Sequence, residues 1–208
     1  MTINFTFTYP IFKETSYDVS PEEAEETKKF FDNFEEVVEN LDNAESLDMN
    51  GSSSDRSASD TYSSCTPGKW TSCWDSCIEE ETNAVEYLRR AKEEVAGAKK
   101  ILNKISSNPP SIEYHRICYR YMDVCDGYLE LVDYRITAYQ HFVDAFQAYK
   151  IGTSVYMYQG ETFISKGNEY IEQYNQREGE YNKKIEELVT LIEALPDKQS
   201  ASNGFSAI

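Results

Sequence analysis

Residues 155–195 read VYMYQGETFISKGNEYIEQYNQREGEYNKKIEELVTLIEAL and carry the longest hydrophobic repeat in the chain. One position recurs every seven residues and holds Gly160, Gly167, Tyr174, Tyr181, Leu188 and Leu195. A second recurring position holds Ile164, Ile171, Glu178, Ile185 and Ile192. A sustained repeat of this spacing is typical of a helix that packs along another helix. It predicts one long helix, which Pro196 ends.

The two glycines of this repeat indicate a close contact with a neighbouring helix. A glycine inside a helix costs about 1 kcal/mol relative to alanine. We therefore expect Gly160 and Gly167 to make room for large side chains from the preceding helix, with Phe142 and Phe146 as the candidates.

Residues 72–105 and 111–149 predict two further long helices. The seam of the first alternates spacings of four and three with alanine at every second position: Ala84, Leu88, Ala91, Val95, Ala98, Leu102 and Ile105. Small residues at one seam position let a neighbouring helix approach closely. Apolar residues of the second helix cover a wide arc, which indicates a central helix with more than one neighbour. Short turns at 108–110 and 151–154 make 72–195 an antiparallel three-helix bundle.

Residues 20–48 predict a shorter acidic helix that begins with a capping box. Ser20 is suited to cap the helix, Pro21 suits the first helical position, and Glu23 completes the box. Residues 49–71 are rich in serine, which predicts a flexible linker. The fold class is therefore all-α: an elongated antiparallel bundle of three long helices plus this shorter N-terminal helix, with coiled-coil-like packing.

The two ends of the chain differ from the bundle. Residues 1–19 read as an extended arm with a short strand, because apolar residues alternate with polar ones through Phe5, Phe7 and Tyr9. A lone strand needs a partner, so these three residues are candidate contacts with another chain. Residues 196–208 predict a flexible tail.

The charge of the chain narrows its partners. The formal net charge is -17, and thirteen acidic residues against two lysines lie between Glu14 and Asp48. This charge disfavours nucleic acid and anionic membrane surfaces. The acidic helix is either a solvated face or a docking face for a basic protein, with Glu35, Glu36 and Glu39 as candidate contacts.

The cysteines and tryptophans leave alternatives open. Five cysteines, an odd number, favour reduced thiols in a cytoplasmic protein. The alternatives are an oxidised link through Cys65 or Cys73, or a metal site, which lacks a second ligand pair. Trp70 and Trp74 either staple the linker onto the bundle end or form an exposed anchor for a partner.

The residue pattern offers no catalytic centre. A di-iron bundle needs two Glu-x-x-His pairs, but Ile112 and Ala138 stand three residues before the two histidines. No glycine-rich phosphate loop and no nucleophile–base pair stands out. Arg135 and Glu178 interrupt the apolar stripes at heights that do not match, so we do not expect them to pair; a polar residue at such a position often fixes helix register or oligomeric state. We therefore expect no enzyme activity and no cofactor.

The favoured interpretation is a structural or protein-interaction protein that self-associates. The first alternative is an effector, tip or adaptor protein secreted without a signal peptide; the second is a ligand carrier or enzyme with a pocket between helices.

The sequence contains no run of about 18 apolar residues, so it predicts no transmembrane segment. No signal peptide opens the sequence, so we expect a cytoplasmic location, with signal-independent export as the alternative.

Overall fold

The computed structural model describes residues 21–69 and 71–195, which form four helices. These are α1 (Pro21–Tyr62), α2 (Thr71–Ile105), α3 (Ile112–Ile151) and α4 (Ser154–Glu193). The predicted all-α fold and the bundle of helices are thereby confirmed. The arm at 1–19, the tail at 196–208 and Trp70 lie outside the described residues.

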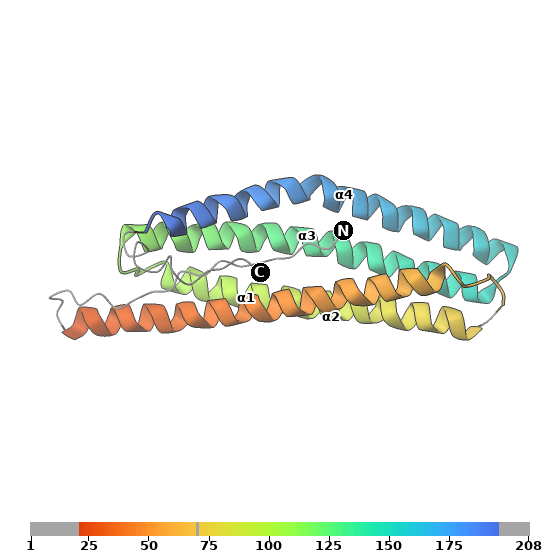
Figure 1. Cartoon of the computed structure of the whole chain (residues 1–208), viewed down its shortest axis with the longest axis horizontal. Coiled ribbons are helices and arrows are strands. Elements are labelled where there is room, and N and C mark those ends of the chain that lie inside the picture. The colour runs from red at the N-terminus through yellow and green to blue at the C-terminus, as the bar shows by residue number, and fades with distance from the viewer. Residues whose placement is uncertain (1–20, 70, 196–208) are drawn as a thin grey trace.

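The four helices lie antiparallel to their neighbours in the chain and form an elongated bundle (Figure 1). α1 packs on α2, α2 on α3, and α3 on α4. α3 lies between the α1–α2 pair and α4, as its wide apolar arc predicts. At 1.5 Å per residue, the helices give the bundle a length of about 60 Å.

The predicted short N-terminal helix and the linker at 49–71 are wrong, because α1 continues to Tyr62 and is the longest of the described helices. Its three-and-four spacing does not stop at residue 48. Asp48, Gly51 and Ala58 are all buried, so small and polar residues continue the seam that larger residues begin. The serines between them contribute little to the core, and only residues 63–70 connect α1 to α2.

Small seam residues bring α1 and α2 close together. A Cβ atom added to Gly51 would lie 3.3 Å from the Ala84 carbonyl oxygen and 3.3 Å from Leu88. The alanine positions predicted for the α2 seam are fully buried. Close backbone approach therefore replaces bulky side chains between these two helices.

The glycines of α4 make the predicted room for aromatic rings of α3. A Cβ atom added to Gly167 would lie 2.3 Å from Cε1 of Phe142, and one added to Gly160 would lie 2.5 Å from Cε1 of Tyr149. Phe142 is thus confirmed as a partner. Phe146 is not the partner of Gly160; its ring packs beside Trp74 instead.

The α1–α2 connection rests on the turn between α3 and α4. Gly152 ends α3 with a positive φ of 73°, which only glycine adopts without strain. The backbone N–H of Gly68 donates to the Tyr149 carbonyl oxygen at 3.3 Å. A Cβ atom on Gly152 would lie 2.3 Å from the Gly68 Cα, so two glycines permit this contact. The contact holds both connections together at one end of the bundle.

Candidate functional site

A buried ion pair joins α1 to α3 near the middle of the bundle. The Arg135 guanidinium donates from Nη1 to Asp48 Oδ1 at 2.6 Å. Arg135 is only 7% exposed and Asp48 only 3% exposed. Two side chains this deeply buried remain charged only when they form an ion pair and further hydrogen bonds, because removing an ion from water costs several kcal/mol.

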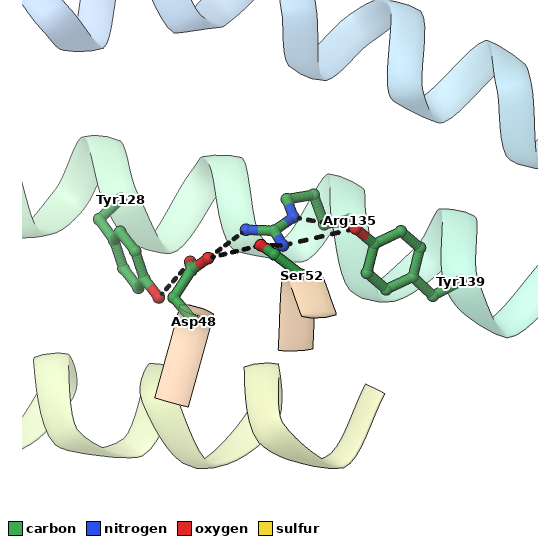
Figure 2. Close-up of polar contacts among 5 residues, drawn as sticks. All are labelled: Asp48, Ser52, Tyr128, Arg135 and Tyr139. Carbon is green, nitrogen blue, oxygen red and sulfur yellow. Dashed lines mark hydrogen bonds and ion pairs between the residues drawn. The ribbon is translucent and has the colours of Figure 1, made fainter. Parts of the chain in front are cut away.

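Neighbouring hydroxyl groups supply those hydrogen bonds (Figure 2). Tyr128 donates to the second Asp48 oxygen at 2.9 Å, and Arg135 Nη2 donates to Ser52 Oγ at 2.8 Å. Arg135 Nε and Nη2 also donate to the Tyr139 hydroxyl, each at 3.4 Å. We call these five residues, Asp48, Ser52, Tyr128, Arg135 and Tyr139, the central network.

Electrostatics keep the central network in one protonation state. Burial lowers the pKa of Arg135, but Tyr139 and Asp48 beside it outweigh that effect and raise the pKa above its ordinary value. Burial, followed by the Asp48 carboxylate, raises the pKa of Tyr128 well above its ordinary value. The guanidinium also lies over the Tyr139 and Tyr174 rings, 5.6 Å and 5.9 Å from their centroids. Arg135 therefore stays charged and Tyr128 stays a donor.

A buried carboxyl lies close to this network. Glu81 of α2 is 1% exposed, and its Oε1 has no hydrogen-bond partner among the described residues. Burial, followed by the charge of Asp55, raises the pKa of Glu81 to about 9. Burial also raises the pKa of Asp55, against the opposing effect of Arg135. Glu81 is therefore protonated and neutral near pH 7.

The central network can do little chemistry as it stands. Its polar atoms face one another, and it includes neither a thiol nor an imidazole. Its geometry suits the register role predicted for Arg135, since the ion pair forms only at one relative height of α1 and α3. The sequence does not reveal Asp48 as the partner of Arg135, because Asp48 stands where the predicted acidic helix ends. Glu178 is half-buried on α4 and is not part of the network.

A disulfide between Cys65 and Cys73 ties the α1–α2 connection to the start of α2, with their Cα atoms 5.7 Å apart. The preference for reduced thiols throughout is therefore wrong for these two cysteines, and the alternative of an oxidised link describes them. The connection that carries Cys65 leads directly into α2, which carries Cys73, so the two cysteines lie within bonding distance. Cys77, Cys118 and Cys125 are buried thiols, and the last two lie in the main hydrophobic core.

Trp74 is 1% exposed, so it is not an exposed anchor in this structure. Its Nε1 donates to the Thr66 carbonyl oxygen at 3.2 Å, and its ring lies against Phe146 and Tyr149. Trp74 therefore holds the α1–α2 connection against the end of the bundle, which is the first of the two roles predicted for it.

The predicted acidic contacts lie on the outer face of α1. Glu35, Glu36 and Glu39 are exposed, and no ion pair with another described residue neutralises them. A basic protein partner for this face stays a prediction. Phe5, Phe7 and Tyr9 of the candidate strand fall outside the described residues.

The disulfide end of the bundle exposes apolar side chains in a part of the chain with few charges. Ile151, Val155, Tyr156 and Tyr158 are 53%, 65%, 41% and 73% exposed. Residues 151–160 contain no charged residue, and residues 61–74 contain only Lys69. We call the four exposed residues the apolar tip. The uncharged run 151–160 is the sequence signal from which the apolar tip could have been predicted.

The opposite end carries a shallow pocket of about 540 Å³ lined by His115, Arg116, Tyr119, Arg120, Asp123 and Leu191. Arg120 already pairs with Asp123 and Glu187, each at 3.3 Å. The described residues contain no group of His, Cys, Asp and Glu side chains arranged to hold a metal ion. None of the four helices has the length and apolar content needed to cross a membrane.

A comparison with protein-family models, curated proteins and solved structures finds no match for this chain.

Proposed function

We propose that this chain is a non-enzymatic interaction protein, a rigid helical rod that self-associates end to end through its apolar tip. The single observation that carries the proposal is the exposure of four large apolar side chains in an uncharged stretch of a protein with net charge -17. Exposed apolar side chains that gather in one part of a surface mark an interaction site, whereas single exposed apolar residues are normal.

A second copy of the chain is the occupant that the distribution of charge favours. Parallel side-by-side contact through α1 would bring the acidic first halves of two α1 helices together, whereas contact through the tips keeps them at opposite ends.

Light scattering or sedimentation equilibrium tests this proposal over a range of micromolar concentrations. We expect a dimer that dissociates on dilution, because an end contact buries less area than a standard interface. Changing Val155→Asp together with Tyr158→Asp places two unpaired charges in the contact and gives a monomer at every concentration.

A matched pair of changes at the other end is the control. Ile112 and Tyr119 are 58% and 52% exposed, so Ile112→Asp with Tyr119→Asp adds the same charge to a comparable surface. This variant keeps the dimer. A wild-type chain that stays monomeric, or equal effects of the two pairs, contradicts the proposal.

The Cys65–Cys73 disulfide favours one second candidate, an exported effector or adaptor protein. Structural disulfides persist in oxidising compartments and are rare in the cytosol. Alkylation of all thiols at the moment of cell lysis, followed by peptide mapping, reports the native state. A closed disulfide and recovery of the protein outside the cell support export; reduced cysteines and retention in the cytosol favour the intracellular role.

A further inference from the structure

Three cysteines meet at the disulfide end of the bundle. Cys65 lies in the connection after α1, and its bonded partner Cys73 lies in the first turn of α2. Cys77 follows Cys73 by four residues, so both side chains lie on the same face of α2. The Cys77 sulfur is 3.8 Å from the Cys65 sulfur. Cys65 therefore has two cysteines within reach.

We propose that Cys65, Cys73 and Cys77 form a thiol–disulfide exchange site in which Cys65 alternates between Cys73 and Cys77. In the forward step, the Cys77 thiol loses its proton and its sulfur bonds to Cys65 Sγ. The Cys65–Cys73 bond breaks, and Cys73 leaves as a thiolate that takes up a proton. The step consumes one thiol and one disulfide and forms one of each, so it needs no external oxidant or reductant.

The surroundings of the three sulfurs permit this exchange but make it slow, because burial, followed by the charge of Glu81, raises the pKa of the Cys77 thiol to about 11 and leaves little thiolate near pH 7. Cys77 Sγ donates to the Ala58 carbonyl oxygen at 3.7 Å, which holds the thiol beside the end of α1. Cys65 and Cys73 are half-buried, and the Ser64 hydroxyl lies 3.8 Å from Cys73 Sγ. Cys73 thus becomes a half-exposed thiol after exchange, whereas Cys77 is fully buried before it. A shift of roughly 2 Å in one side chain would close the second bond.

The exchange also reaches the neighbouring turn. Residues 63–70 carry Cys65, and Gly68 in the same connection contacts Gly152 at the end of α3. Moving the bond from Cys73 to Cys77 changes the residue of α2 to which the connection is tied, four residues further along the helix. The exchange site is therefore placed to change how the connection sits on the α3–α4 turn.

Peptide mapping of a Cys73→Ser variant tests whether the second bond forms. The protein is oxidised in a glutathione buffer that closes the wild-type disulfide, then alkylated and cut before aspartate and after glutamate. Wild type gives peptide 60–74 closed by an internal bond. The variant gives 60–74 joined to 75–79, which contains Cys77 alone among the cysteines. Cys65 and Cys77 recovered as thiols in the folded variant contradict the proposal.

Alkylation without a reductant tests the exchange itself. Oxidised wild type kept with N-ethylmaleimide accumulates label on Cys73, because exchange exposes that thiol. The Cys77→Ser variant, which lacks the attacking sulfur, keeps Cys73 unlabelled. Circular dichroism and thermal unfolding establish that each variant is folded beforehand. Equal labelling of Cys73 in both proteins, or none in either, overturns the proposal.

Discussion

The two halves of α1 use the same helical spacing with different side chains. The first half buries Phe34, Val37 and Leu41, which read as a helix in the sequence. The second half buries Asp48 and Ala58 at positions that continue the same seam. A helix can therefore pack in a bundle without a continuous apolar stripe when neighbouring helices supply the missing groups. Leu88 fills the space beside Gly51, and Arg135 neutralises the charge of Asp48.

The largest expected effect comes from removing the countercharge of the second half. Changing Arg135→Met leaves Asp48 buried without its ion pair and should lower the free energy of unfolding by about 3–5 kcal/mol. Urea denaturation measures the change.

A double variant separates the charge from the packing. Asp48→Leu combined with Arg135→Met removes both charges and should recover most of the lost stability. A double variant as unstable as Arg135→Met alone would show that the ion pair itself, and not the stranded carboxylate, accounts for the loss.

A proline in the serine-rich half distinguishes a helix from a linker. Ser53 is exposed and lies within α1, so Ser53→Pro removes a helical hydrogen bond and should cost about 3 kcal/mol. Thermal unfolding measures the loss. Ser53→Ala, which suits a helix, should be neutral or slightly stabilising. A proline variant as stable as wild type would favour the flexible linker at 49–71 over a helix that extends to Tyr62.

The contact between α4 and α3 predicts a smaller effect. Gly167→Ala places a methyl group against the Phe142 ring and should cost about 1–3 kcal/mol. Gly179→Ala is the matched change, because nothing lies within 4 Å of its added Cβ atom, and it should gain up to about 1 kcal/mol. Chemical denaturation that ranks the two variants in the opposite order would refute the packing role.

The last expected effect is the pH dependence from Glu81. Its pKa of about 9 in the folded chain lies above the ordinary value of 4.5, so the folded state holds the extra proton between these pH values. Stability from this group is complete below pH 4.5 and falls as pH rises toward 9. Asp55 contributes in the same direction.

Glu81→Gln removes the ionisable group and should flatten the fall of stability between pH 6 and 9, as thermal melts at each pH would show. The difference between wild type and variant should shrink as the pH falls. An identical pH profile for both proteins would mean that the Glu81 carboxyl ionises at its ordinary pH.

Much of the bundle could be predicted from periodicity, and its polar centre could not. The seams of α2 and α4 and the role of Gly167 follow from spacing and residue size alone. Asp48 escaped prediction because a buried carboxylate needs a distant partner, Arg135, that no local pattern reveals. The Cys65–Cys73 bond could be given only as an alternative, because a count of cysteines carries no distances. The helix at 49–62 was missed because its serine-rich composition is typical of a linker, although the helical spacing of its buried residues continues.

Hydrogen exchange measured by mass spectrometry tests most directly whether the central network holds the serine-rich half of α1 in the bundle. We expect the amides of 49–62 to be protected in wild type to a degree comparable with those of 30–44, and Arg135→Met to lose protection mainly in 49–62. Exchange of 49–62 at the rate of an unstructured chain in the wild-type protein would contradict the account.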